Sequence, residues 1–103
     1  MVLDEYENVK KYFCNITKVL QIYEDEVFGN NSRKIFISIT EEALKNRVFA
    51  IDMAGASLGT IWLDKDNCIT DIKIDDYYVG YVFPENINDK LEKYIGQKFD
   101  IAE

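Results

Sequence analysis

Three short patterns in this 103-residue chain contain residue types that carry out chemistry in other proteins. Residues 55–59, with the sequence GASLG, match the G-x-S-x-G pattern of a nucleophile elbow, in which a strand-to-helix turn presents a serine to a histidine base. The chain has no histidine, and a predicted strand, not a helix, follows the segment. We therefore interpret residues 55–59 as a connection made of small residues.

A second pattern resembles the start of a calcium-binding loop, because Asp64 and Asp66 place carboxylates at alternate positions. The glycine that an EF-hand requires at its sixth position is Ile69 here, and its final glutamate is Asp75. We expect turn chemistry from residues 64–67 and no metal site. Weak cation binding by the oxygen atoms of this turn is the alternative.

The third pattern places Asp71 near Asp75 and Asp76, which suggests the paired carboxylates of acid–base catalysis. These aspartates surround Lys73, as on the solvated face of a strand, and no apolar pocket is predicted beside them. Without histidine the chain also lacks the commonest general base and zinc ligand. We expect a protein that is not an enzyme and holds no cofactor.

Acidic and aromatic side chains gather in the same part of the chain. Seven tyrosines and one tryptophan exceed what one small core needs, and both residue types are favoured at protein interfaces. Residues 50–83 contain six acidic and two basic side chains, within a chain of net charge −7. The predicted binding surface consists of Asp64, Asp66, Asp71, Asp75, Asp76, Tyr77, Tyr78 and Tyr81. The alternative is that about half of these tyrosines are core residues with only their hydroxyls at the surface.

The elements that position these residues begin with a predicted helix over residues 2–27. Its apolar side chains recur in alternating steps of four and three residues, which is the pattern of one helix face. The stripe consists of Val2, Tyr6, Val9, Phe13, Ile16, Leu20, Tyr23 and Val27. Tyr12 and Val19 widen the stripe, which favours a helix packed on its own sheet over a coiled coil.

Alternating apolar residues predict a series of strands after this helix. The predicted strands cover residues 34–40, 47–54, 60–63, 69–75 and 77–83. Residues 40–46 form either one helical turn capped by Thr40 or a wide loop. Residues 85–95 carry apolar side chains at four-residue spacing and predict a short helix, after which Phe99 and Ile101 dock the tail.

This order of elements predicts one α+β domain over residues 1–103. We expect a long N-terminal helix, a four- to five-stranded, mostly antiparallel meander sheet and a short C-terminal helix, with the helices on one face. A chain of this length has room for a single core.

Charge and cysteine use indicate the setting in which the protein works. A net negative chain repels phosphate, so direct binding to nucleic acid or to an anionic membrane is disfavoured, whereas a basic protein is attracted. Cys14 and Cys68 lie far apart in sequence, as expected for free thiols in a reducing compartment. The first residues contain no apolar signal segment. We therefore expect a cytoplasmic protein.

The small size, acidity and lack of catalytic groups resemble the general character of bacterial toxin-immunity proteins, including those of contact-dependent inhibition systems, and of other small nuclease inhibitors. The resemblance implies a binding protein that occludes a basic partner, such as a nuclease toxin, and acts as a monomer or homodimer. Two alternatives come from other classes. One is a homo-oligomerising structural module, and the other is a small-ligand-binding domain without catalytic activity.

Overall fold

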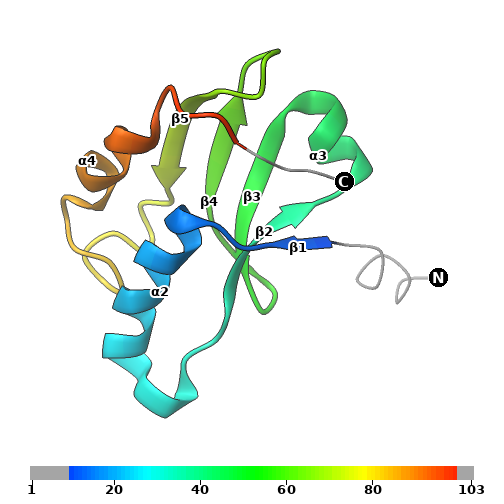
Figure 1. Cartoon of the computed structure of the whole chain (residues 1–103). Helices are drawn as coiled ribbons and strands as arrows, with labels where there is room; N and C mark the ends of the chain where they lie inside the picture. The colour runs from blue at the N-terminus through cyan, green and yellow to red at the C-terminus, as the bar shows by residue number, and fades with distance from the viewer. Residues whose placement is uncertain (1–9, 100–103) are drawn as a thin grey trace.

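The computed structural model describes residues 10–99, which form an α+β fold around a five-stranded sheet (Figure 1). Its strands are β1 (Lys10–Tyr12), β2 (Ile35–Ile39), β3 (Val48–Met53), β4 (Ala56–Leu63) and β5 (Ile69–Ile74). The strands lie side by side in sequence order, and every neighbouring pair is antiparallel. The predicted antiparallel meander is therefore confirmed.

The alternating pattern of the central strands explains how the sheet builds a core. In β2, Ile35, Ile37 and Ile39 point to one side and are buried. Phe49 and Ile51 of β3 do the same, since successive side chains of a strand point to opposite faces. We call this the core face of the sheet, and the other side, which carries Phe36, Ser38 and Asp52 among others, the polar face.

The N-terminal helix α2 (Asn15–Phe28) is shorter than the predicted helix over residues 2–27. Residues 10–12 are a strand instead, paired with β2. The helix begins at Asn15 because the Thr17 hydroxyl accepts a hydrogen bond from the Cys14 backbone N–H at 2.9 Å and donates to the Cys14 carbonyl oxygen at 2.8 Å. Cys14 thus caps the helix and does not lie within it. The first three stripe residues, Val2, Tyr6 and Val9, lie outside the described residues.

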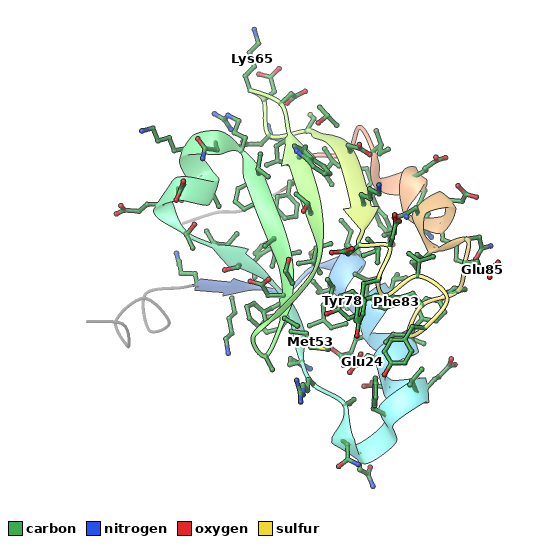
Figure 2. The ribbon with its side chains drawn as sticks, turned by 180° about the vertical axis from the view of Figure 1, so that it is seen from behind. Glu24, Met53, Lys65, Tyr78, Phe83 and Glu85 are labelled. Carbon is green, nitrogen blue, oxygen red and sulfur yellow. The ribbon has the colours of Figure 1, made fainter. Side chains whose placement is uncertain are left out.

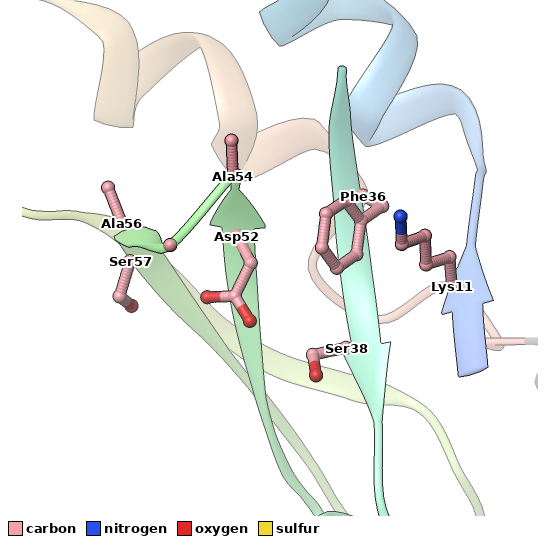
Figure 3. Close-up of a pocket in the computed structure, with 8 residues that line it drawn as sticks. Lys11, Phe36, Ser38, Asp52, Ala54, Ala56 and Ser57 are labelled. Atoms are coloured by element: carbon pink, nitrogen blue, oxygen red, sulfur yellow. The ribbon is translucent and has the colours of Figure 1, made fainter. Parts of the chain in front are cut away.

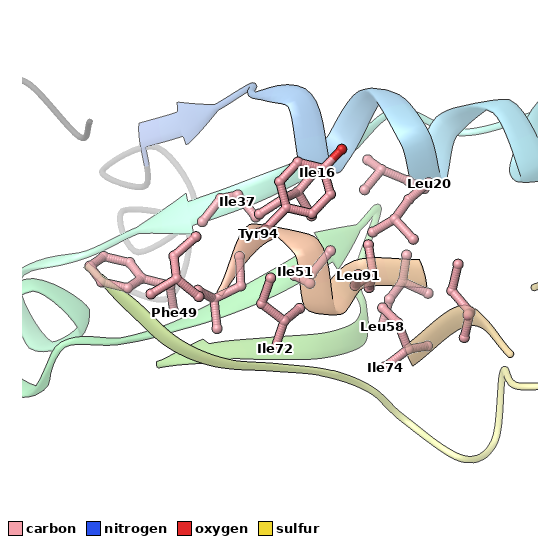
Figure 4. Close-up of a cluster of buried hydrophobic side chains, with 14 of the residues drawn as sticks. Ile16, Leu20, Ile37, Phe49, Ile51, Leu58, Ile72, Ile74, Leu91 and Tyr94 are labelled. Carbon is pink, nitrogen blue, oxygen red and sulfur yellow. The ribbon is translucent and has the colours of Figure 1, made fainter. Parts of the chain in front are cut away.

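The middle of the predicted stripe does form the buried side of α2. Ile16 and Leu20 are buried and meet side chains of the core face, whereas Phe13 and Val27 at its ends are each 48% exposed. Figure 4 shows Ile16 and Leu20 above the same cluster that receives Leu91 from the C-terminal part of the chain. A 3-10 turn, η1 (Gly29–Asn31), ends the helix.

The short C-terminal helix is α4 (Ile87–Leu91), followed directly by the 3-10 turn η2 (Glu92–Tyr94). Ile87 and Leu91 are buried as the spacing predicts. The next buried residue is Tyr94, and Ile95 is 40% exposed. A 3-10 turn has about three residues per turn, so the side chain that follows Leu91 on the same face lies three positions later, not four.

The connection between β2 and β3 is the helical turn α3 (Glu41–Asn46), so the alternative of a wide loop is wrong. The Thr40 hydroxyl caps it by accepting from the Ala43 backbone N–H at 3.0 Å. At its other end Arg47 takes a left-handed conformation and its Nη1 donates to Asn67 Oδ1. This bond ties α3 to the β4–β5 turn.

The predicted tail docking is confirmed for Phe99, and Ile101 lies outside the described residues. The Phe99 backbone N–H donates to the Asn67 carbonyl oxygen at 2.7 Å. Its ring packs edge-on against Tyr12 and Phe49, with ring centroids 5.2 and 5.7 Å away. The tail therefore joins β1 to the middle of the sheet.

The predicted strand over residues 77–83 is wrong, and these residues form a series of turns. The Phe83 backbone N–H donates to the Tyr78 carbonyl oxygen at 3.2 Å, and Gly80 N–H donates to the Phe83 carbonyl oxygen at 2.7 Å. Gly80 has a φ of +82°, which glycine adopts readily and which reverses the chain. The segment consequently bonds to itself and adds no strand to the sheet.

The outer edge of β5 is covered by the chain that follows it. The Ile69 backbone N–H donates to the Gln97 carbonyl oxygen at 2.9 Å, and the Ile74 N–H donates to Asn88 Oδ1 at 2.8 Å. At the other edge, the described residues of β1 are Lys10–Tyr12. Between residues 10 and 99, no helix has both the length and the apolar character needed to cross a membrane.

Candidate functional site

The most prominent exposed feature is the segment after β5, residues 75–83, which we call the tyrosine loop. Tyr77 is 73% exposed and Tyr81 is 63% exposed, although both are large aromatic side chains. The Tyr77 ring meets Tyr78 edge-on at a centroid distance of 4.9 Å and Tyr81 at 6.4 Å. Asp75 and Asp76 at the start of the loop are also exposed. The loop therefore presents a small aromatic cluster bordered by two carboxylates.

Buried side chains fix the base of this loop. Val82 and Phe83 are buried, and the Phe83 ring packs edge-on against Tyr23 of α2 at 6.2 Å. Tyr78 is half-buried against the core. These buried side chains hold the aromatic cluster in place, which limits the conformational entropy that the cluster loses when it binds.

A buried carboxylate lies beneath the loop. Glu24 of α2 directly follows Tyr23, whose ring packs against Phe83 at the base of the loop. Glu24 is only 2% exposed, and its Oε1 atom has no hydrogen-bond partner among the described residues. Burial raises the pKa of Glu24, while the backbone N–H and the charge of Arg33 oppose that shift and Asp25 adds to it.

The β4–β5 turn contains the other part of the predicted surface. Asp64 Oδ1 accepts from the backbone N–H groups of Asp66 at 2.8 Å and of Cys68 at 2.9 Å. These two bonds, that of Cys68 first, lower the pKa of the Asp64 carboxyl. Asp64 therefore holds the turn together, and Asp66 is exposed beside it.

The predicted surface is consequently divided into two parts. β5 separates them, and its six residues extend over about 20 Å. In Figure 2, Lys65 of the turn lies at the opposite end of the sheet from Tyr78. Asp71 lies between them on β5, paired with Trp62, and its Oδ1 accepts from the Ile72 backbone N–H at 2.9 Å. The structure thus brings together the five residues of the tyrosine loop, and not Asp64 or Asp66.

The polar face of the sheet borders the tyrosine loop, and its β4 residues were not predicted to belong to the binding surface. A hollow of about 260 Å³ lies where the two meet. Its lining residues are Ser57, Gly59, Thr60, Trp62, Lys73, Asp75 and Asp76. The signal was present in the sequence, because the residues between the buried positions of β3, β4 and β5 are the ones that line this face.

Asp52 was also not predicted as a site residue. It lies on the polar face of β3, half-buried, opposite Phe36 of β2 and Ser57 of β4. Burial raises the pKa of Asp52, and a hydrogen bond from the Ser38 hydroxyl works against that shift. The interpretation of residues 55–59 as a connection is wrong for residues 56–59, which belong to β4 and pair with β3. Ser57 therefore lies within a strand and not at a strand-to-helix turn.

The two cysteines are free and half-buried. Within residues 10–99, no group of three or more cysteine, aspartate or glutamate side chains is arranged to hold a metal ion. Comparison with protein-family models, with curated proteins and with solved structures found no match to this chain. The function must therefore be argued from the chemistry of the surface alone.

Proposed function

We propose that this protein binds a basic protein partner and neutralises it by covering its functional surface, as a toxin-immunity protein does with a nuclease toxin. One observation carries the proposal. Tyr77 and Tyr81 are exposed, in contact with each other, and directly beside the exposed carboxylates of Asp75 and Asp76.

The exposure of these rings favours an interface over ordinary solvation on energetic grounds. Tyrosine rings left in water gain free energy when a partner removes them from it, and tyrosines often dominate the binding energy of interfaces. Their packing at 4.9 and 6.4 Å gives the cluster a defined shape. The net charge of −7 would attract a basic partner and raise its association rate.

We further propose that both helices cover one face of the sheet and leave the polar face next to the tyrosine loop open to the partner. The shared burial of Ile16 and Leu20 of α2 with Ile87 and Leu91 of α4 supports this arrangement. The hollow that contains Trp62 and Asp75 would then extend the contact surface from the loop onto the sheet.

The proposed compartment is the bacterial cytoplasm. The support is that Cys14 and Cys68 are both free, which suits a reducing environment. An inhibitor kept there would protect the cell that makes it.

The first experiment identifies the partner by capture from the source-cell lysate at low salt, followed by elution at high salt. A stoichiometric basic protein is the expected result. Its association rate is then measured against salt concentration for the wild type and for the variant Asp75→Lys/Asp76→Lys. The variant should associate more slowly and with a flatter salt dependence, because the steering charge is reversed.

The matched control is Glu42→Lys/Asp66→Lys, which changes the net charge equally with two exposed carboxylates away from the tyrosine loop. An equal effect in both variants would mean that total charge, not this surface, attracts the partner. Capture of no protein, together with a stable homodimer of the purified chain, would instead support the homo-oligomerising module.

A further inference from the structure

A second hollow, with a volume of about 640 Å³, lies on the polar face and shares Ser57 with the hollow beside the tyrosine loop (Figure 3). Side chains from β1 to β4 surround it, among them Lys11, Phe36, Ser38, Asp52 and Ser57. The turn at residues 54–56 forms its end with two alanines and one glycine. These small residues leave the space in front of Asp52 unfilled.

The carboxylate of Asp52 lies within the hollow beside an aromatic ring. Phe36, Asp52 and Ser57 are consecutive partners across β2, β3 and β4, so their side chains form one row on the polar face. In Figure 3 the carboxylate of Asp52 points into the space between Ser57 and Ser38. The Ser38 hydroxyl donates a hydrogen bond to it.

Among the residues that line the hollow, Lys11 is the one cation, and its Nζ lies over the Phe36 ring on the β1 side, not beside Asp52. The causes that shift its pKa are burial and the Ser38 hydrogen bond, with no contribution from a charged group of the described residues. A half-buried carboxylate with only a hydroxyl partner has lost hydration that a cation would replace.

The ring of Phe36 already attracts a cation on one side. Lys11 Nζ lies over this ring at 5.0 Å from its centroid. Figure 3 shows Lys11 on the β1 side of the ring and Asp52 on the β3 side. A group that enters from the β3 side would therefore meet an aromatic wall and a carboxylate together, which is the environment that ammonium and guanidinium groups favour.

We propose that this hollow binds a primary ammonium or guanidinium group, whose charge pairs with Asp52 and whose apolar part packs on Phe36. The inference goes beyond the proposed function and does not rest on it, because the site can be tested with the purified protein and a small probe. A lysine or arginine side chain and a free small amine present the same chemistry.

The experiment titrates the protein with butylguanidinium and follows the backbone amides by NMR. Saturable shifts centred on Phe36, Asp52 and Ser57 are expected. Butylurea, which has nearly the same shape and no charge, is the control probe and should cause much smaller shifts. Equal binding of the two probes would overturn the proposal, and so would shifts centred on the tyrosine loop.

The variant Asp52→Asn should weaken butylguanidinium binding about tenfold, because a charge-assisted hydrogen bond becomes a neutral one. Asp66→Asn makes the same change in charge at an exposed position of the turn and should leave the affinity unaltered. Unchanged binding by Asp52→Asn would exclude the carboxylate as the receptor. The wild-type comparison of the two probes remains decisive if this variant is unstable.

The affinity of the wild type should also fall on acidification, and at a higher pH than for an exposed aspartate, since burial raises the pKa of Asp52. A capped arginine, with both backbone ends blocked, separates the two sources of the ligand. Binding as tight as that of butylguanidinium assigns the site to a protein side chain. Exclusion of the capped arginine, with butylguanidinium still bound, assigns it to a free small amine.

Discussion

The two ends of β5 carry acidic segments that use their carboxylates in opposite ways. In the β4–β5 turn, Asp64 accepts two backbone hydrogen bonds and so belongs to the local structure. In the tyrosine loop, the Asp75 carboxylate accepts one longer hydrogen bond, from the Tyr77 backbone N–H at 3.3 Å, and Asp76 is exposed. Two segments with similar acidic sequences therefore differ in how many of their carboxylates are available to a partner.

The stability of these two ends responds to pH in opposite directions. The pKa of Asp64 is lowered by the backbone N–H groups of Cys68 and Asp66. The pKa of Glu24, beneath the tyrosine loop, is raised by burial. Acid therefore weakens the turn and favours the folded state at the base of the loop.

The largest expected effect concerns the junction of β5 with the tyrosine loop. A Cβ added at Gly59 would collide with the Lys73 carbonyl oxygen and approach the Ile74 Cα to 3.0 Å. Gly59→Ala should therefore push the end of β5 away from β4 and lower the free energy of unfolding by about 3 kcal/mol. Urea denaturation measures this, with Ser57→Ala, at an exposed position of the same strand, as the control. An unchanged midpoint would show that the two strands separate there at little cost.

The next effect tests whether the exposed rings bind a partner. Tyr77→Ala/Tyr81→Ala should weaken the affinity for the captured protein about a hundredfold, as expected for the loss of central interface aromatics. The melting temperature should hardly change, because both rings are mostly exposed. Leu44→Ala on α3 removes an exposed apolar side chain elsewhere and should leave the affinity intact. Equal losses in both variants would remove the distinction between the loop and the rest of the surface.

A third experiment compares the two aspartates directly. Asp64→Ala leaves the backbone N–H groups of Asp66 and Cys68 without their acceptor and should lower the melting temperature by about 5 °C. Asp75→Ala removes only a long, exposed bond and should lower it much less. Differential scanning calorimetry at neutral pH gives both values. If Asp75→Ala proved the more damaging, the tyrosine loop would depend on Asp75 for its structure.

The smallest effect concerns Glu24. Because its folded-state pKa is raised, the stability gained from the protonated carboxyl is fully present below its ordinary value of 4.5 and is lost as pH rises through the raised value. Glu24→Gln should therefore raise the melting temperature at pH 7 by about 2 °C, and the advantage should disappear at acid pH.

For Asp64, the pH dependence of the stability has the opposite sign. Its stabilisation is present above the ordinary value of 3.8 and is lost as pH falls through the lowered value. Asp64→Asn should therefore flatten the acid limb of the stability profile, whereas Glu24→Gln should change the neutral region. Parallel profiles for the two variants would contradict the assignment of opposite roles.

The spacing of apolar residues correctly predicted those elements whose buried side chains all point to the core. Ile35 and Ile37 alternate strictly, and the sequence located that strand within one residue at each end. It could not locate the start of α2, because Lys10 to Tyr12 also fit a helical stripe and only pairing with β2 makes them a strand. Tertiary contacts override local pattern in such short segments.

In the tyrosine loop, too, the local pattern predicted the wrong element, because a strand pattern is present and no strand forms. Tyr77, Val79 and Tyr81 alternate as in a strand, yet Gly80 reverses the chain, and Asn88 occupies the edge of β5 that a further strand would need. The predicted acidic and aromatic residues of this loop are nevertheless close in space, because they were close in sequence. Asp52 was missed because its partners, Phe36 and Ser38, come from another strand.

The covered outer edge of β5 has a consequence for how copies of this chain meet at high concentration. A free sheet edge is a template on which a second molecule can add a strand, and such addition leads to aggregation. Here Gln97 and Asn88 already occupy the outward N–H groups of Ile69 and Ile74. At the opposite edge, the described part of β1 is Lys10–Tyr12, and its two lysines carry charges that repel a second copy. The fold therefore exposes an aromatic cluster at one end of the sheet, while the described edges of the sheet disfavour the addition of strands from a second molecule.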